Sequence, residues 1–219
     1  GAQENTVLSC IGQQARGHAV RLLVGPTTGP EGSLVEEARA AGVDLVVVPF
    51  LFRALAPWAD LLAYRDLRRQ IRAFRPDVVH THSSKAGVIG RSAAWDENQR
   101  ARRRASRQAA SQAEAQAKVI HTIHGLPFHP YQSGPANFQY RAAERFAARR
   151  CHRIVSVADA MTDQAVAAGI APREKFVTVY SGMKLEPFLD DSRDRHALRA
   201  RWGFGKEDLV LGKIARLFE

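Results

Sequence analysis

Two hydrophobic segments of this chain end in histidine. His82 ends the segment 77–82, and His124 ends the segment 118–124, where Gly125 follows at once. An imidazole at the end of a strand can hydrogen bond to a phosphate or a sugar hydroxyl, and a neighbouring glycine lets the ligand approach the backbone closely. His82, His124 and Gly125 are therefore candidate ligand-binding residues. The alternative interpretation is that each histidine bonds only a carbonyl group of the protein itself.

Two expected helix starts supply groups that bind anions. One begins at Gly1 and Ala2, and the other begins at Ser83 with Lys85 close behind it. The first amides of a helix have no partner within the helix, and the helix dipole attracts negative charge to them. These residues therefore join the candidates, and their combination with the histidines favours a ligand that carries phosphate.

A metal site is the main alternative use of the histidines. Those concerned are His80, His82, His121, His124 and His129. Zinc takes three or four such ligands, usually with help from cysteine or carboxylate, and no Cys, Asp or Glu accompanies the histidines at the strand ends. We therefore expect no metal site.

No arrangement for a nucleophile stands out either. The sequence lacks a Gly-x-Ser-x-Gly elbow, a Walker phosphate loop and a complete Gly-x-Gly-x-x-Gly after a strand. Cys10 and Cys151 do not make a disulfide framework, which favours a reduced, cytosolic setting. We expect both cysteines to be structural, although the cations around Cys151 could lower the pKa of its thiol.

Alternating strands and helices must position these residues. Hydrophobic runs predict strands at 19–24, 43–49, 77–81, 118–123, 153–157 and 176–180. Helical spacing predicts helices at 2–15, 34–41, 58–74, 135–151 and 158–168, and one that runs from Ser83 or Ser84 towards Trp95. This order predicts the α/β class, with a Rossmann-like parallel sheet, helices on both faces, and ligands bound beyond the carboxyl ends of the strands.

The chain is strongly basic. In 219 residues the formal net charge is +10, and five arginines lie between residues 100 and 107. The positive electrostatic field of such a chain suits anionic partners generally, including nucleotide diphosphates, lipid phosphates, an anionic membrane or nucleic acid. Residues 96–117 contain no large apolar residue and offer no face to bury, so we expect a basic insertion that is a solvated helical extension or a mobile excursion. The alternative is an arm that binds RNA or a membrane.

Several stretches together resemble the N-terminal half of a family-four retaining glycosyltransferase of the GT-B architecture. They are Gly1-Ala2-Gln3, Gly17-His18-Ala19-Val20, Arg75–His82, His121–Gly125, Ile154–Val157, Tyr180–Met183 and Gly212–Leu217. The resemblance covers nearly the whole chain outside residues 96–117. It implies two Rossmann-like domains around a catalytic cleft, the first for an acceptor and the second for a nucleotide-sugar, which is a co-substrate and not a cofactor. It also implies that no metal is needed and that the anomeric configuration is retained.

The resemblance assigns roles to individual residues. His124 lines the reacting centre as the candidate catalytic residue, while Gly1 and Ala2 lie near the donor phosphates. Arg216 meets the donor diphosphate, where a guanidinium neutralises charge on the leaving group. The acceptor-side candidates are His82, Ser83, Lys85 and Gly125.

The resemblance also predicts the domain organisation. Residues 1–187 are expected to form the acceptor-side domain without its first strand, and residues 188–219 a linker and the start of the donor domain. Within the latter, a strand is expected to run from Leu209 towards the end of the chain, and Gly212–Leu217 resembles the opening strand of the donor domain. Lys184 stands where the family commonly has Asp, which puts the local hinge geometry in question. The lysine and paired glutamates that act on the donor are not included, so this fragment is expected to be inactive alone.

Two other functions stay open. Another GT-B enzyme, such as a nucleotide-sugar epimerase, would also place histidine and arginine in its cleft. A non-catalytic protein would use the arginines of residues 96–117 to bind an anion or nucleic acid, although nucleic acid is not the expected partner.

The expected acceptor is a sugar, a lipid-linked sugar or a precursor of a cell-surface polysaccharide. No apolar run is long enough to span a bilayer, and the expected location is the cytoplasm, with a peripheral contact at the inner face of the membrane as an option. Loop aromatics such as Phe50, Phe52, Phe128 and Tyr131 could make that contact, helped by the basic field. The alternative for these aromatics is ordinary core and loop packing.

Overall fold

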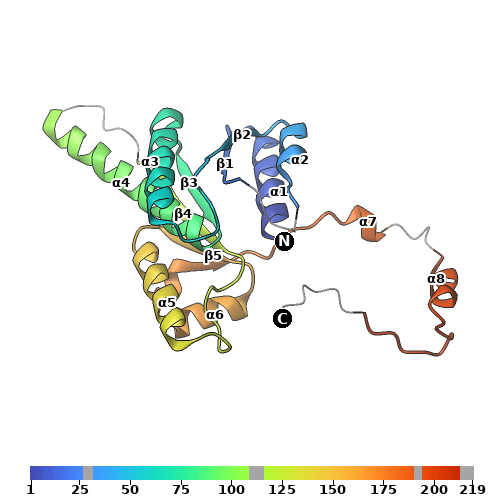
Figure 1. Ribbon diagram of the computed structural model, residues 1–219. Helices are drawn as coiled ribbons and strands as arrows, with labels where there is room; N and C mark the ends of the chain where they lie inside the picture. Colours follow the sequence, from blue (N-terminus) through green and yellow to red (C-terminus); the bar gives the residue numbers. More distant parts are fainter. Residues whose placement is uncertain (27–31, 109–115, 190–193, 213–219) are drawn as a thin grey trace. The chain divides into compact units, whose positions relative to one another are not determined.

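The computed structural model describes residues 1–26, 32–108, 116–189 and 194–212 (Figure 1). Contacts divide the chain into two compact units, Gly1–Gly182 and Met183–Glu219. The helices are α1 (Ala2–Gln14), α2 (Val35–Ala40), α3 (Pro57–Phe74), α4 (Ser84–Gln108), α5 (Gly134–Ala148), α6 (Asp159–Ala167), the short 3-10 helix η1 (Arg173–Lys175), α7 (Glu186–Leu189) and α8 (Arg195–Arg201). The strands are β1 (Arg21–Val24), β2 (Asp44–Val47), β3 (Val78–His82), β4 (Lys118–Ile123), β5 (Arg153–Ser156) and β6 (Phe176–Thr178). The acceptor and donor roles expected for residues 1–187 and 188–219 stay predictions.

The strands of the first unit pair only in parallel. β3, β4, β5 and β6 form a four-stranded sheet in that order, and β1 pairs with β2 in a separate two-stranded sheet. Among the described strands, β1, β2, β3 and β6 each have a neighbour on one side only. The predicted α/β class with parallel strands is confirmed. β4 has the predicted bounds, and most of the other strands are shorter than predicted.

Helices cover both faces of the β1–β2 sheet. Leu22 packs against a cluster that contains Val7 of α1 and Ala38 of α2. The next residue, Leu23, packs against Ala63 of α3 in a different cluster. Successive side chains of a strand point to opposite faces, so these two clusters lie on the two sides of the sheet.

β4 lies at the centre of the larger core. Val119 and Ile123 on one face of this strand pack in a cluster with Ala94 of α4, Ala148 of α5 and Ile154 of β5. Parallel strands buried in this way read as nearly continuous apolar runs, which is why the sequence predicted β4 so closely. This core fixes the position of the carboxyl ends of β3 and β4.

The amphipathic helix predicted at 58–74 is α3. Ala63 and Leu67 on its apolar face are buried, and α3 ends at Arg75, which adopts the left-handed conformation with φ of 51°. Pro76 follows directly, and a residue before proline is disfavoured in the helical conformation. Pro76 was therefore a sufficient sequence signal to predict where this helix ends.

α4 is longer than predicted. The helix was expected to run towards Trp95, and it continues to Gln108, with its second half extending past the end of α3 (Figure 1). The arginines Arg102, Arg103 and Arg104 on this extension are exposed. A helical extension is therefore confirmed up to Gln108, and residues 109–115 lie outside the described part. None of the described helices is both long and apolar enough to cross a membrane.

The first turn of the basic insertion is packed, which corrects the expectation that residues 96–117 offer no face to bury. Glu97 is only 7% exposed and receives a hydrogen bond from Arg68 Nε of α3 at 2.5 Å. The side chain of Asn98 bonds both backbone groups of Ala117, with its amide donating at 2.8 Å and its carbonyl accepting at 3.0 Å. The prediction failed because it counted apolar side chains only, whereas here polar partners hold the segment.

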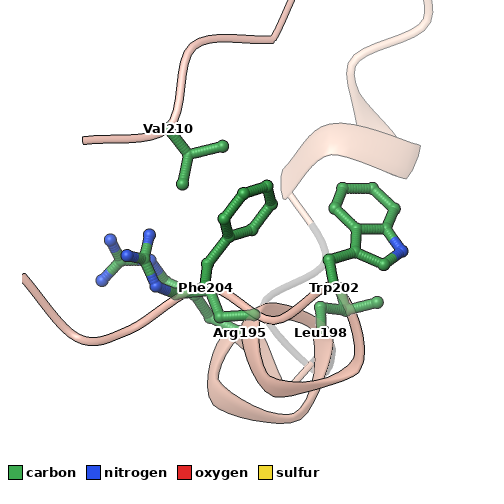
Figure 2. Close-up of a pocket in the computed structure, with 6 residues that line it drawn as sticks. Arg195, Leu198, Trp202, Phe204 and Val210 are labelled. Carbon is green, nitrogen blue, oxygen red and sulfur yellow. The ribbon is translucent and has the colours of Figure 1, made fainter. Parts of the chain in front are cut away.

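The second unit carries a capped helix and a small apolar hollow. Asp194 accepts hydrogen bonds from the backbone amides of His196 and Ala197 at 2.8 and 3.1 Å, which caps α8. Figure 2 shows Trp202 and Phe204 lining the hollow, and their rings meet edge to face with centroids 6.4 Å apart.

The strand expected from Leu209 onward is not formed in its described part. Residues 209–212 have no regular secondary structure, and the rest of the predicted strand lies outside the described residues.

Candidate functional site

The carboxyl edge of the four-stranded sheet brings two candidate histidines together. His82 ends β3 and His124 follows β4, and Nδ1 of His82 lies 2.9 Å from Nε2 of His124. The two rings stack with their centroids 5.2 Å apart. Because one nitrogen must donate and the other accept, the bond fixes the tautomer of each ring relative to the other. The sequence placed both residues at this edge, but it gave no sign that they bond each other.

His80 extends the pair along the same face of the sheet. Its ring lies 4.3 Å from that of His82 between centroids, and its Nε2 lies 2.7 Å from Oγ1 of Thr122 on β4. Residues two apart in a strand share a face, so the three imidazoles form one row that ends at the edge. Thr122 is thus a supporting residue that the sequence analysis did not identify.

Burial holds these imidazoles in the neutral form. It lowers the pKa of His80 to about 4, with a smaller contribution from His124. Burial, followed by the neighbouring His80 and His124, lowers the pKa of His82 to about 3. The pKa of His124 is also lowered, chiefly by burial. A neutral imidazole exchanges hydrogen bonds with hydroxyl groups, but it offers a phosphate no charge–charge attraction.

Gly1 and Gly125 border on open space near this row. The start of α1 lies within electrostatic range of His124 at the end of β4. A Cβ atom added at either glycine would meet no atom within 4 Å. The start of α1 has no side-chain cap, so its first amides remain available to an anion. Open space, free amides and neutral imidazoles thus lie together.

Ser83 connects the histidines to α4 through an unusual backbone conformation. It is exposed, and its φ of 59° lies in the left-handed region that non-glycine residues rarely adopt. Its carbonyl accepts a hydrogen bond from the amide of Gly87 at 2.9 Å, which starts the helix. Such strain persists only where the surroundings fix it, and it is often found at functional sites.

The ammonium group of Lys85 is already engaged within the protein. It forms an ion pair with Asp60 of α3 and a hydrogen bond with the carbonyl of Ala54, and the side chain is 15% exposed. Asp60 was not identified from the sequence, because nothing in a single sequence links positions so far apart. A role for Lys85 in acceptor binding stays a prediction, and the contact shows that Lys85 also fixes the loop before α3.

A comparison with known proteins identifies the family. The model of glycosyltransferase family 4 matches residues 6–187. The chain belongs to glycosyltransferase family 4. This family 4 chain is also 25% identical over 171 residues to UDP-Gal:alpha-D-GlcNAc-diphosphoundecaprenol alpha-1,3-galactosyltransferase of Escherichia coli. That alignment covers 78% of the chain and 40% of the relative.

Solved structures share the fold of this family 4 chain. Anabaena HepE in complex with UDP and glucose aligns with a TM-score of 0.59 and 18% identity, over 91% of this chain and 46% of that one. A glycosyltransferase from Rickettsia africae aligns with a TM-score of 0.60 and 14% identity, over 94% of this chain and 46% of that one. The chain therefore spans less than half the length of each of these relatives, and the expected GT-B-type fold is confirmed.

His121 lies on the opposite face of β4 from His124 and is a structural residue. It is 2% exposed, and its Nδ1 lies 2.9 Å from the hydroxyl of Thr81. Burial, followed by the nearby charge of Arg91, holds the pKa of His121 well below its ordinary value. For this histidine, the interpretation that it bonds only within the protein fits the structure.

A buried ion pair lies near His121 in this family 4 chain. Arg91 is fully buried and donates to Glu144 of α5 at 2.8 Å and to the carbonyl of Gly87 at 2.9 Å. A Cβ atom on Gly87 would lie 2.5 Å from Cε1 of His121. The glycine therefore lets α4 lie directly on the imidazole.

Arg216 and the cysteines complete the sequence-predicted candidates. Arg216 lies outside the described residues, so its expected contact with the donor diphosphate stays a prediction. Both Cys10 and Cys151 are buried. Burial raises the pKa of the Cys151 thiol despite the opposing effect of Arg91, so the expectation that nearby cations could lower it is wrong. In the described part of the chain, no three His, Cys, Asp or Glu residues are grouped so that they could hold a metal ion.

Proposed function

We propose that the protein transfers a sugar from a nucleotide-sugar to an acceptor hydroxyl and that the anomeric configuration is retained. The observation that carries this proposal is the neutral pair of His82 and His124 beside the open space at Gly125, in a chain of glycosyltransferase family 4. Transfer breaks the bond between the anomeric carbon and the nucleotide diphosphate, forms a bond to the acceptor oxygen and releases the acceptor proton. Such a reaction needs a site for hydroxyl groups next to a site for phosphate.

The donor side of this proposal uses His124 and the start of α1. Neutral His124 hydrogen bonds to the transferring sugar, which makes it the candidate catalytic residue. The uncapped amides at Gly1 and Ala2, together with Arg216, bind the diphosphate. A UDP-sugar is the proposed donor, because the Escherichia coli relative is named for UDP-Gal and HepE was solved with UDP and glucose.

The acceptor side uses His82, Ser83, Lys85 and Gly125. We assign a lipid-linked acceptor, since the Escherichia coli relative is named for a sugar carried on diphosphoundecaprenol. His82 bonds an acceptor hydroxyl, and the open space at Gly125 leaves room for the acceptor sugar. Lys85 stays paired with Asp60 until an acceptor diphosphate competes for its ammonium group.

The test uses the longest natural polypeptide that carries these residues. It is incubated with a panel of nucleotide-sugars and acceptors with and without a lipid diphosphate, and transfer is followed by mass spectrometry. His124→Ala is expected to reduce transfer at least about 100-fold, while His18→Ala, at an exposed position, leaves the rate unchanged. Transfer that survives in His124→Ala would remove this residue from the mechanism. If no donor is turned over, the alternatives of another enzyme or a binding protein replace the proposal.

A further inference from the structure

The segment between β2 and α3 displays large apolar side chains on the surface. We call residues 49–58, which include the first two residues of α3, the apolar loop. Within it, Phe50 and Phe52 are 41% and 39% exposed, and Leu55 and Trp58 are 81% and 79% exposed. Single exposed apolar residues are normal, but four of them in one short segment suggest a surface that meets an apolar partner.

The backbone of the apolar loop is held so that these side chains point outward. Leu51 packs inward against the cluster around Val48 and Ala63, and its amide bonds the carbonyl of Val48 at 3.1 Å. A Cβ atom on Gly25 would lie 1.9 Å from the carbonyl oxygen of Leu51, so the loop rests directly on the end of β1. With Leu51 as the inward anchor, the exposure of its neighbours belongs to the folded structure.

The apolar loop is attached to the candidate site. Lys85 bonds the carbonyl of Ala54 within the loop and pairs with Asp60 just beyond it. Lys85 is only three residues from His82, at the start of α4. The loop and the histidine row therefore occupy the same edge of the molecule, connected by one side chain.

The charge on this edge selects a partner. The segments 48–59 and 124–143, which follow β2 and β4, contain no Asp or Glu, but they contain Arg53 and Arg141. The second segment also exposes Tyr131 at 97% and Phe138 at 70%. The nearest carboxylates are engaged within the protein, since Asp60 pairs with Lys85 and Asp159 accepts a hydrogen bond from Tyr180. Aromatic side chains beside arginines match the interface of an anionic bilayer, where aromatic rings lie at the headgroup level and cations meet lipid phosphates.

We infer that the apolar loop docks on a bilayer that contains anionic phospholipid, so that Leu55 and Trp58 enter the headgroup region. This orientation turns the edge with His82 and His124 towards the membrane, where a lipid-linked acceptor has its diphosphate and sugar. The benefit for acceptor binding rests on the proposed function, whereas docking itself needs no catalysis. A second copy of the chain on the same surface is the competing outcome.

The experiment measures flotation of the 219-residue chain with vesicles. Vesicles of phosphatidylcholine alone are compared with vesicles that also contain about 30 mol% phosphatidylglycerol. The double variant Leu55→Ser/Trp58→Ser is expected to bind the anionic vesicles at least about tenfold more weakly than the wild type. Phe146→Ser, which removes an exposed aromatic at the far end of α5, is the matched control and is expected to stay within about twofold of wild type.

Fluorescence supplies a second measurement, which does not depend on whether the double variant Leu55→Ser/Trp58→Ser folds. In the background Trp202→Phe, bromine-labelled lipids should quench Trp58, which is exposed, far more than Trp95, which is half-buried. No flotation with anionic vesicles, or equal flotation of the double variant and the wild type, would overturn the inference. Dimerisation that is lost in the double variant, without vesicle binding, would assign the surface to a second copy.

Failure of docking and failure of the proposed function can be told apart. In the longest natural polypeptide, Leu55→Ser/Trp58→Ser should keep the wild-type transfer rate to a water-soluble acceptor and lose rate only with acceptors in vesicles. His124→Ala should bind vesicles normally and lose transfer to both acceptors. Vesicle binding without any transfer would retain the docking surface and reject the proposed activity.

Discussion

Histidines lie at both ends of the four-stranded sheet, and they have different partners. At the amino end, Nδ1 of His152 accepts a hydrogen bond from the amide of Val119 at 2.9 Å, and the amide of His152 donates to the carbonyl of Val119 at 2.7 Å. At the carboxyl end, His82 and His124 bond each other beside open space. A histidine whose partner is the backbone serves the fold, whereas two imidazoles that bond each other can exchange that bond for one to a ligand.

The largest expected effect separates these two kinds of histidine by activity. His82→Ala and His124→Ala should each reduce transfer about 100-fold, and the double variant should lose little more, because the two rings act as a unit. His152→Ala should change transfer less than about twofold and only reduce stability. Single-turnover rates of the longest natural polypeptide measure all four. Fully additive losses for His82 and His124 would mean that they act separately and would break the comparison.

A pair of glycine variants tests the contrast between closed and open surroundings. Gly87→Ala should lower the free energy of unfolding by about 2–3 kcal/mol, because the new Cβ would lie 2.5 Å from His121. Gly125→Ala should change stability by less than about 0.5 kcal/mol, since a Cβ there meets no atom within 4 Å, and it should weaken acceptor binding. Urea denaturation gives both free energies. A strongly destabilised Gly125→Ala would show that this position is not open.

The pH dependence of stability sharpens the comparison in a third way. The folded-state pKa values of His80 and His82 are about 4 and 3, below the ordinary value of 6.5, so the unfolded chain takes up protons first as the pH falls. Their contribution to stability is therefore complete above about pH 7 and decreases towards pH 4, by roughly 3 kcal/mol for each histidine.

The measurement is the free energy of unfolding at pH 7 and pH 4.5 for the wild type and for His80→Gln/His82→Gln. The variant should lose less stability over this interval than the wild type. Identical slopes would show that the two imidazoles are not held neutral by the fold.

The smallest expected effect concerns the hydrogen bonds between Asn98 of α4 and the residue that precedes β4. Asn98→Ala should lower the free energy of unfolding by about 1 kcal/mol, because it removes both bonds to the backbone of Ala117. Vesicle binding and transfer should not change. Ser106→Ala on the exposed part of α4 is the control, and its stability should match that of the wild type. An equal loss in both variants would mean that Asn98 contributes no more than an exposed residue.

The sequence predicted the parts of the structure that depend on local apolar pattern. The run at 118–123 and the amphipathic spacing at 58–74 gave β4 and α3 with little error. Once the strands were known to be parallel, the meeting of His82 and His124 followed from topology, because carboxyl ends of neighbouring strands share an edge.

The sequence did not predict features that depend on distant polar partners. Asp60 forms an ion pair with Lys85, and Glu97 forms one with Arg68. The partners are so far apart in the sequence that the local residue pattern does not predict these pairs. The left-handed backbone of Ser83 was also missed, since serine does not favour that conformation and only the packed surroundings impose it. Polar pairing between elements therefore accounts for most of the difference between the predicted and observed structures.

The division between the β1–β2 sheet and the β3–β6 sheet has a consequence for how the molecule opens. No strand hydrogen bonds join the two described sheets. β1 contacts α3 and α4 through side chains, namely the cluster around Leu23 and Ala63 and the guanidinium of Arg21, which lies 4.7 Å from the centre of the Phe74 ring. We therefore expect α1, β1, α2 and β2 to unfold together at a lower free energy than the rest of the first unit. Native-state hydrogen exchange should show the amides of β1 protected less than those of β4. Each such opening carries Gly1 away from His124, so the fraction of molecules with an assembled site is set by the local stability of these four elements.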